Sequence, residues 1–261
     1  MLTCYDATTA RHLAAAGVDM LLVGDSAAQV ILGFDRSIDA PLDLMITLTA
    51  AVKRGAPDRF VIGDMPFMSY QADDAEGVRN AGRFMTEGQA DAIKLEVNRA
   101  YGELIGRLSR AGIPTIAHIG WRPQMAPYTG IRTAKVAGRT AADARAMIDE
   151  AMLMEDCGAV MLLIEQCPAE VSARIVDRVS IPVIGCGAGP ACHGHVVVLQ
   201  DLLGTSERHP SFIQPVTDGG RWLQDAARQW VDLLASGAYL REHPYQMAPG
   251  EAEKLANEPP L

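Results

Sequence analysis

The sequence of 261 residues has no apolar run close to the roughly 20 residues that a membrane-spanning helix needs, although 49% of its residues are hydrophobic. Its first residues are neither basic nor like a secretory signal peptide. Positive charge is also scarce, since 23 Lys and Arg residues face 32 Asp and Glu residues and leave a formal net charge of -9. A field of this sign repels phosphate. We therefore expect a soluble, cytoplasmic protein that has neither a membrane nor a nucleic acid as a partner.

The five cysteines form no C-x-x-C pair and no zinc-binding spacing, and their odd number fits a reducing compartment. The sequence also lacks internal repeats, low-complexity tracts and an internal linker. Its length is about that of one (β/α)8 barrel, roughly 250 residues. These features favour a single TIM-barrel domain over residues 1–261, with residues 205–261 as a C-terminal helix and tail.

Five apolar stretches each lead to one acid or histidine and then break at a turn. They are LLVGD ending at Asp25, FVIGD ending at Asp64, AIKLE ending at Glu96, TIAHIG containing His118 and MLLIE ending at Glu165. Short apolar runs followed by helical patterns are typical of parallel strands that are buried on both faces. When such strands close into a barrel, their carboxyl ends meet on the face that carries the chemistry. We therefore expect these five side chains to lie together.

The order of the expected elements indicates an α/β fold. Strands alternate with helical patterns, as in a parallel sheet, and seven clear units with a weaker eighth favour a closed (β/α)8 TIM barrel over an open doubly wound sheet. After the barrel we expect an amphipathic helix at residues 219–237. The expected strands are residues 3–5, 20–25, 60–64, 92–96, 115–118, 160–165, 182–185 and 195–199, and the expected barrel helices are residues 7–17, 41–54, 74–87, 100–111, 141–157 and 169–179.

Lys94 and Glu96 are two residues apart on an expected strand, so they point to the same side of it. Charges that face a barrel interior are costly to bury unpaired, so these two must pair, bind a metal or contact a ligand. With Asp25 and Asp64, Glu96 forms a set of hard oxygen donors that suits Mg²⁺. The alternative is that each acid caps the helix after it. Polar groups at five strand ends favour the site over this alternative.

Six stretches follow one another between Cys4 and about Gly204: LLVGDS, GDMPFMSY, ADAIKLE, IAHIGWRPQ, LLIEQCPAE and IPVIGCGAG. Together they resemble the ordered motifs of the ketopantoate (3-methyl-2-oxobutanoate) hydroxymethyltransferase family. The resemblance implies a TIM barrel of the phosphoenolpyruvate mutase/isocitrate lyase superfamily. It also implies transfer of a one-carbon unit from 5,10-methylenetetrahydrofolate to 3-methyl-2-oxobutanoate, which gives 2-dehydropantoate in pantothenate biosynthesis. Members of the family assemble as homo-oligomers, described as decamers.

The resemblance also implies a role for each strand-end group. Asp25 and Asp64 resemble the magnesium ligands of the family, and Glu96 completes the metal site directly or through water. Glu165 resembles the general base that removes a proton from C3 of the keto acid. Mg²⁺ or another divalent metal would stabilise the resulting enolate, which then attacks the methylene carbon of the folate. The substrate-binding residues implied in this way are Asp25, Ser26, Asp64, Lys94 and His118.

Three segments depart from the family pattern. Val97 and Asn98 follow the KLE motif where the family commonly has two glycines, and residues 33–38 replace a loop like G-H-D-S-T. Where the family usually has D-G-Q and a later histidine, this chain has CHGH at residues 192–195 and then Gln200. All three segments fall in expected loops on the ligand-binding face, where they bear on the choice of keto acid and of one-carbon donor.

Two other readings stay open. A Mg²⁺-dependent C–C lyase or mutase that acts on a different 2-keto acid would share the enolate, but it usually needs a catalytic cysteine in a flexible loop. The nearest candidates, Cys167 and Cys186, fall within transferase-like motifs. A non-catalytic paralogue is the other reading, and the retention of costly buried charges argues against it. His193 and His195 suggest a metal pair, but two loop histidines without acid partners are more often pocket or surface residues.

Overall fold

The computed structural model describes residues 1–125, 136–240 and 244–257 of the chain. These residues form two compact units, Met1–Val216 and Thr217–Leu261. The first unit holds the sheet and the helices around it. The second unit holds two α-helices and a short 3-10 turn. In the described part of the chain, no helix combines the length and the apolar character that crossing a membrane requires.

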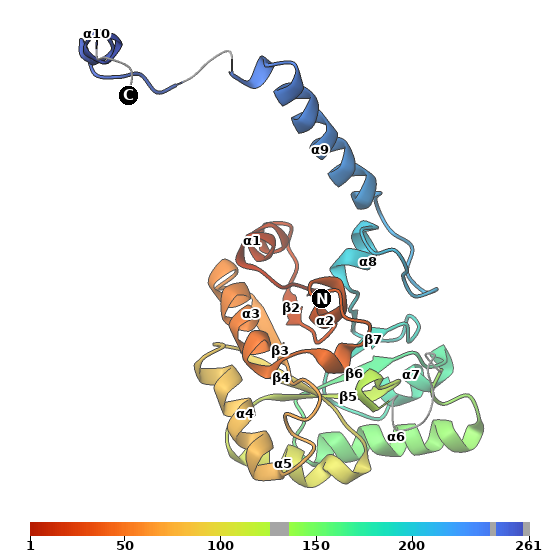
Figure 1. Cartoon of the computed structure of the whole chain (residues 1–261). Coiled ribbons are helices and arrows are strands. Elements are labelled where there is room, and N and C mark those ends of the chain that lie inside the picture. The colour runs from red at the N-terminus through yellow and green to blue at the C-terminus, as the bar shows by residue number, and fades with distance from the viewer. Residues whose placement is uncertain (126–135, 241–243, 258–261) are drawn as a thin grey trace. The chain divides into compact units, whose positions relative to one another are not determined.

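Eight parallel strands form one sheet in the first unit, and each strand pairs with the next one along the chain. A parallel bridge between Leu2 and Val197 joins the two edges, and N of Thr3 donates to O of Val197 at 3.2 Å. The sheet therefore closes into a (β/α)8 barrel, with its helices outside (Figure 1). The strands are β1 (Leu2–Thr3), β2 (Met20–Val23), β3 (Phe60–Asp64), β4 (Ala92–Glu96), β5 (Thr115–Gly120), β6 (Met161–Glu165), β7 (Val183–Cys186) and β8 (Gly194–His195).

Several helices of the barrel begin at a side chain that accepts hydrogen bonds from the first turn, as Asp6, Asp73 and Thr140 do. Such caps satisfy backbone N–H groups that a helix leaves without partners. The α-helices of the first unit are α1 (Ala7–Ala15), α2 (Ala27–Val30), α3 (Leu42–Gly55), α4 (Asp74–Thr86), α5 (Gly102–Arg110), α6 (Ala141–Asp156), α7 (Ala169–Val176) and α8 (Leu199–Leu203). The 3-10 helices are η1 (Ser37–Asp39), η2 (Arg99–Tyr101) and η3 (Pro123–Met125).

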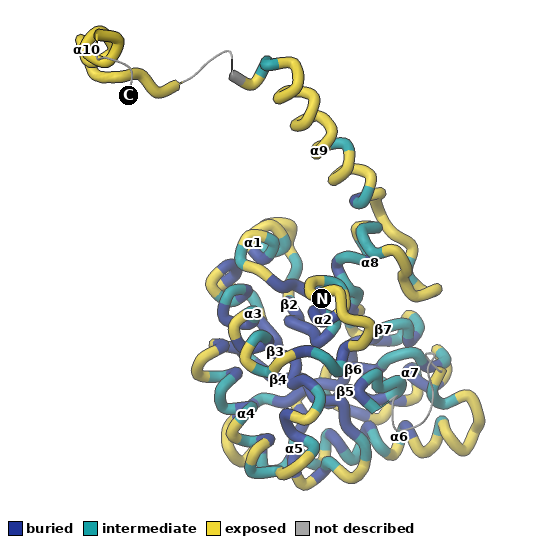
Figure 2. Tube along the Cα trace, in the orientation of Figure 1, coloured by how far each residue is buried: buried dark blue, intermediate teal, exposed yellow. Residues whose placement is uncertain are grey.

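Alternation along the strands divides the core into two layers. Residues such as Ile93 and Leu95 face outward and pack with the helices in the larger buried cluster. The opposite side of each strand faces the barrel interior, as the period of two requires. Figure 2 shows the strands as the most deeply buried part of this unit. The interior cluster consists of Leu22, Ile62, Ala92, Ile116, Met161, Leu163, Ile184 and Val196.

Polar residues continue this interior row toward the carboxyl ends of the strands. Asp64 stands two residues after Ile62, and Glu165 stands two residues after Leu163. The same spacing puts Lys94 and Glu96 beyond Ala92, and His118 beyond Ile116. The apolar side chains therefore fill the barrel interior, and the polar side chains lie next to them at the carboxyl-terminal mouth of the barrel.

The second unit contains α9 (Gly219–Ala235), η4 (Ala238–Leu240) and α10 (Glu251–Ala256). The indole of Trp230 and the ring of Tyr239 meet edge to face, with centroids 4.6 Å apart. Trp222, Leu223 and Val231 on α9 are exposed. The expected helix at residues 219–237 is therefore present. Within the expected tail, residues 241–243 and 258–261 lie outside the described residues.

The first and the eighth of the expected strands agree least with the structure, while the second, fifth, sixth and seventh differ from it by one or two residues at an end. The first was expected at residues 3–5 and is Leu2–Thr3, and the eighth was expected at residues 195–199 and is Gly194–His195. The eighth strand was expected too late because the residues after His195 are apolar. Val198 is in fact the N-cap of α8, and Leu199 is the first residue of that helix. The expected strands at residues 60–64 and 92–96 have the bounds of β3 and β4.

Candidate active site

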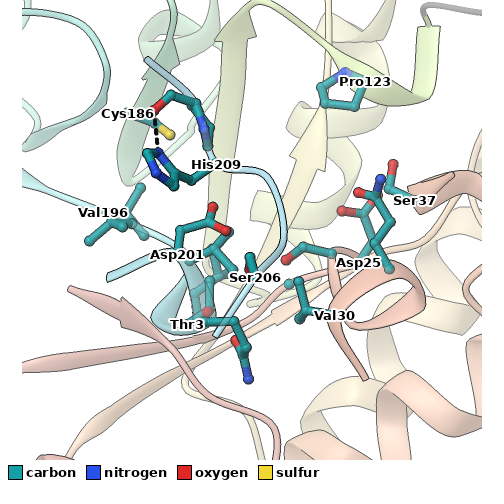
Figure 3. Close-up of a pocket in the computed structure, with 18 of the residues that line it drawn as sticks. Thr3, Asp25, Val30, Ser37, Pro123, Cys186, Val196, Asp201, Ser206 and His209 are labelled. Carbon is teal, nitrogen blue, oxygen red and sulfur yellow. Dashed lines mark hydrogen bonds between the residues drawn. The ribbon is translucent and has the colours of Figure 1, made fainter. Parts of the chain in front are cut away.

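A cavity of about 880 Å³ opens at the carboxyl ends of the strands. It is lined by all seven residues that the sequence singled out as site candidates: Asp25, Ser26, Asp64, Lys94, Glu96, His118 and Glu165. Figure 3 shows Asp25 and Ser37 on one side of the cavity and Thr3, Asp201 and Val196 on the other. The volume lies in the range of pockets that enclose drug-sized ligands.

Asp64 is the centre of a buried charged group. Its Oδ1 lies 2.9 Å from Nζ of Lys94, and its Oδ2 accepts a hydrogen bond of 2.9 Å from N of Asp25. Burial raises the pKa of Asp64 to about 7, although Lys94 opposes the shift. Burial lowers the pKa of Lys94, but the carboxyl groups of Asp64, Asp25 and Glu96 outweigh it and the net shift is upward. The ammonium of Lys94 therefore keeps its charge.

His118 connects this group to the opposite side of the barrel mouth. Its Nδ1 lies 3.4 Å from Nζ of Lys94 and 3.7 Å from Oε1 of Glu96, and its Nε2 lies 3.5 Å from Oε2 of Glu165. Burial, and then the charge of Lys94, hold the pKa of His118 well below its usual range. The imidazole is therefore neutral at physiological pH. A neutral imidazole can donate from one ring nitrogen and accept at the other.

Glu165 ends β6 at a sharp turn in the backbone. Gln166 has a φ of 47°, in the left-handed region that non-glycine residues seldom adopt. Gly120 pairs with Glu165 in the register of β5 and β6, and its φ of 90° and close contact with the Glu165 carbonyl oxygen leave no room for a Cβ atom. Burial raises the pKa of the Glu165 carboxyl group to about 7. A carboxyl group with this pKa exchanges protons readily near neutral pH.

Gln124 was not among the residues expected in the site. It is fully buried in η3, where its N donates to Oε2 of Glu96 at 2.9 Å and its Nε2 donates to Oδ2 of Asp25 at 3.1 Å. Its Oε1 accepts hydrogen bonds of 3.0 Å from the hydroxyl of Tyr70 and from Nε2 of Gln71. Gln124 therefore ties together the loops after β2, β3 and β4. The only sequence signal is its place at the end of IAHIGWRPQ, since an uncharged amide in a loop has no distinctive spacing.

The remaining candidates fall into three local settings. Ser26 is the N-cap residue of α2, and its Oγ lies 2.8 Å from the hydroxyl of Tyr5. His193 accepts a hydrogen bond at Nδ1 from N of Val183, so it supports the start of β7. His195 is exposed on β8. The two histidines therefore have separate surroundings.

The cysteines considered for a lyase lie close to the barrel strands. Cys186 is the last residue of β7 and lines the cavity, while Cys167 is buried just after β6. Burial raises the pKa of both thiols. Neither cysteine is therefore an exposed thiolate of the kind that attacks substrates.

Asp25 and Asp64 have the chemistry of a divalent-cation site. As the side chains stand, no three His, Cys, Asp or Glu groups among the described residues are arranged to hold a metal. However, Mg²⁺ usually takes only one or two direct carboxylates and completes its shell with water and substrate oxygens. Asp25 and Asp64 supply two, and Glu96 lies in the same cavity with Lys94 as the neighbouring cation. The donor set fits a hard divalent cation.

Several solved structures have a fold similar to that of this chain. Phosphonopyruvate hydrolase in complex with oxalate and Mg²⁺ matches 98% of this chain and 88% of its own with a TM-score of 0.61, at 11% identity. A second match is 2,3-dimethylmalate lyase, described as a member of the PEP mutase/isocitrate lyase superfamily. The match covers 98% of this chain and 88% of the lyase chain with a TM-score of 0.57, at 16% identity. Identities this low show the fold alone.

Sequence relatives identify the family. The model of the ketopantoate hydroxymethyltransferase family matches residues 1–242. The 3-methyl-2-oxobutanoate hydroxymethyltransferase of Haloarcula marismortui is 42% identical over 242 residues, which cover 93% of this chain and 89% of the relative. The enzyme of the same name from Syntrophobacter fumaroxidans is 38% identical over 257 residues, which cover 98% and 90%. The chain belongs to the ketopantoate hydroxymethyltransferase family.

Proposed function

We propose that the protein is a 3-methyl-2-oxobutanoate hydroxymethyltransferase, which uses 5,10-methylenetetrahydrofolate as donor and forms 2-dehydropantoate for pantothenate biosynthesis. The names of the curated relatives support this activity. The observation that carries the proposal is one cavity with a carboxyl group of near-neutral pKa, Glu165, and an acid pair with an ammonium, Asp25, Asp64 and Lys94. Removing a proton beside a ketone needs a base and positive charge together.

Asp25 and Asp64 would hold Mg²⁺, with Glu96 in contact directly or through water. Bound there, the ion supplies a Lewis acid that stabilises negative charge on the keto oxygen of the substrate. The backbone hydrogen bond from Asp25 to Asp64 and the amide of Gln124 on Asp25 orient the two acids. Ligands oriented in this way lose little freedom when a metal binds.

The remaining residues would bind the keto acid and move its proton. The ammonium of Lys94 attracts the substrate carboxylate, and the hydroxyl of Ser26, held by Tyr5, offers a further hydrogen bond. Glu165 takes the proton from C3, and the neutral His118 beside it can donate to the carboxylate. The C3 carbon then forms a bond to the methylene carbon of the donor as one of the two bonds from that carbon to the folate nitrogens breaks, and the released nitrogen takes up a proton. Water then supplies the hydroxyl group as the second carbon–nitrogen bond breaks, and the second nitrogen takes up a proton as tetrahydrofolate leaves.

Proton exchange tests this proposal directly. The protein is incubated with 3-methyl-2-oxobutanoate and Mg²⁺ in D₂O, and deuterium at C3 is followed by NMR with and without tetrahydrofolate. Exchange is the expected result in both mixtures. A third mixture, which contains 5,10-methylenetetrahydrofolate, should be the one that also forms the hydroxymethyl product. Cleavage of a C–C bond in a longer 2-keto acid, with no exchange into this one, would instead assign the protein to the lyases.

We also propose that the protein is a cytoplasmic homo-oligomer with neither a nucleic acid nor a membrane as a partner, and that residues 1–261 work as one domain. Exposed apolar side chains on α9, among them Trp222 and Trp230, support an assembly through the second unit. Light scattering on the eluate of a gel-filtration column measures the mass of the assembly. A mass equal to that of one chain at micromolar concentration would refute the homo-oligomer.

A further inference from the structure

The cavity continues beyond the strand-end acids to α8 and the segment that follows it. Gln200, Asp201, Ser206 and Phe212 line this second part, beside Thr3 of β1. A volume of about 880 Å³ is far more than a five-carbon acid fills, since pockets of roughly 300–1,000 Å³ enclose drug-sized ligands. The second part of the cavity therefore has room for another molecule.

Among the described residues, the acceptor groups of three polar side chains in this second part have no hydrogen-bond partner, and those of Gln200 and Ser206 are buried. Asp201 is only 7% exposed, and no described residue gives its carboxyl group a hydrogen bond or an ion pair. In the same part of the chain that the structure describes, Oε1 of Gln200 and Oγ of Ser206 are buried without a partner. Buried polar groups in proteins are usually paired, so two buried unpaired atoms beside the Asp201 carboxyl group in one pocket wall indicate a ligand that pairs them.

These groups are held in fixed positions by the chain around them. N of Leu199, the first residue of α8, donates to Oγ1 of Thr3 at 2.9 Å. After α8, N of Thr205 donates to O of Gln200 at 2.9 Å, which closes the turn that carries Ser206. Further along, the ring of Phe212 packs against Gly187, so closely that a Cβ atom there would collide with it. The segment is thus anchored at β1 and at the end of β7.

Cys186 connects the second part of the cavity to the proposed base. Burial, and then the negative charges of Glu165 and Asp201, raise the pKa of its thiol, so both carboxyl groups lie within electrostatic reach of one atom. In Figure 3, Asp201 and Ser206 lie across the cavity from Asp25 and Ser37. A molecule bound at Asp201 would therefore adjoin a keto acid bound at Asp25 and Lys94.

We propose that Asp201, Gln200 and Ser206 form a subsite for a flat heterocycle with adjacent N–H donors, such as the 2-amino-4-oxopyrimidine ring of a reduced pterin. A carboxylate accepts two parallel N–H bonds from such a ring, as it does from a guanidinium. The amide oxygen of Gln200 accepts a further N–H bond, and the hydroxyl of Ser206 can donate to a ring oxygen or nitrogen. This inference rests on the proposed function, because a reduced pterin is the head group of the proposed donor.

A structural role for Asp201 makes a different prediction. Asp201 lies in the first turn of α8, where an acid stabilises the helix through the macrodipole. In that case the variant Asp201→Asn would melt at a lower temperature and bind pterins as the parent does. A ligand-binding role predicts the reverse.

The test compares Asp201→Asn with the parent and with Asp58→Asn, which removes an exposed carboxylate from the turn before β3. Calorimetry measures the Kd for tetrahydrofolate and for 6-methyltetrahydropterin, which lacks the glutamate tail. Asp201→Asn should weaken both about 10- to 100-fold, the range for loss of a charge-assisted hydrogen bond. Asp58→Asn should change neither. Proton exchange at C3 of the keto acid without folate should equal that of the parent in both variants.

The outcomes separate the subsite from the proposed function. Parent-like pterin binding by Asp201→Asn, or a loss of keto-acid exchange in this variant, would overturn the subsite. A parent protein that exchanges the keto acid but binds no pterin would overturn both the subsite and the folate donor. A parent that binds pterin and does not exchange the keto acid would overturn the proposed reaction and leave the subsite standing. Should Asp201→Asn not fold, Ser206→Ala and Gln200→Leu should each weaken pterin binding, and unchanged Kd values in both would refute the subsite.

Discussion

Lys94 and Asp64 form an ion pair 2.9 Å long between side chains that are only 5% and 1% exposed. The pair belongs to neighbouring strands, because Asp64 of β3 is in register with Lys94 of β4. Removing one member of a buried pair leaves an uncompensated charge and costs about 3–5 kcal/mol. The ammonium of Lys94 is therefore fixed next to the acid pair Asp25 and Asp64, at a position where it could also contact the carboxylate of a bound keto acid.

Replacing Lys94 with methionine should separate binding from stability. Lys94→Met keeps approximately the length of the side chain and removes its charge, so the KM for the keto acid should rise strongly and the free energy of unfolding should fall. The double variant Lys94→Met/Asp64→Asn also removes the carboxylate that Lys94→Met leaves unpaired. Its free energy of unfolding should return toward that of the parent, while its KM for the keto acid should stay high. Urea unfolding and keto-acid titration measure the two effects. An unchanged KM in Lys94→Met would mean that Lys94 only neutralises Asp64.

Activity should require a divalent metal, because Asp25 and Asp64 offer oxygen donors and the proposed chemistry needs a Lewis acid. Dialysis against a chelator should abolish turnover, and Mg²⁺ or Mn²⁺ should restore it. Asp64→Ala should bind Mn²⁺ at least tenfold more weakly, as measured by electron paramagnetic resonance, and should keep the circular dichroism of the parent. Full turnover by the chelator-treated parent would contradict the metal requirement, and parent-like Mn²⁺ binding by Asp64→Ala would reject Asp64 as a ligand.

Gln124 should act by positioning the acids. Gln124→Met keeps the volume but loses the hydrogen bonds to Asp25, Tyr70 and Gln71, which should lower the free energy of unfolding by about 1–3 kcal/mol. It should also weaken Mn²⁺ binding, since Asp25 is no longer oriented. Gln71→Met removes only one of these bonds and serves as the control. A destabilised Gln124→Met that binds Mn²⁺ with the Kd of the parent would limit Gln124 to a structural role.

The sequence predicts those parts of the barrel that depend on local pattern. Five apolar runs with a polar end predict the strand-end residues. The period of two determines whether a side chain faces the barrel interior, and its place at the end of the strand puts it at the mouth of the barrel. Gln124 escapes this reasoning, since its bond to Asp25 joins residues 99 positions apart and comes from a loop. The sequence also does not predict Asp201 as a site residue. Apolar content places the eighth strand at residues 195–199, whereas the strand is Gly194–His195 and Asp201 lies on the helix that follows it. Only the closed barrel brings these side chains to the cavity.

Stability should depend on pH through Glu165. Its pKa rises from 4.5 in the unfolded chain to about 7 in the folded protein, so folding takes up a proton between these values. Protonated Glu165 therefore contributes roughly 3 kcal/mol to the free energy of unfolding. This contribution is fully present below pH 4.5 and is lost as the pH rises through about 7. Glu165→Gln cannot titrate, so its free energy of unfolding should fall less than that of the parent from pH 4.5 to 7.5. Parallel profiles from urea unfolding of the two proteins would show that Glu165 has no raised pKa.

Glu165 should also set the rate of proton removal. Glu165→Gln preserves the shape of the side chain but cannot accept a proton, so C3 exchange into D₂O should fall by about 10²–10⁴-fold while the keto acid still binds. In the parent, the exchange rate should increase with pH and level off above about 7, because the base is active only when ionised. Exchange and keto-acid Kd are measured on the same preparation at each pH. A Glu165→Gln variant that exchanges at the parent rate would remove Glu165 from the mechanism, and His118, whose Nε2 lies 3.5 Å from its carboxylate, would become the next candidate base.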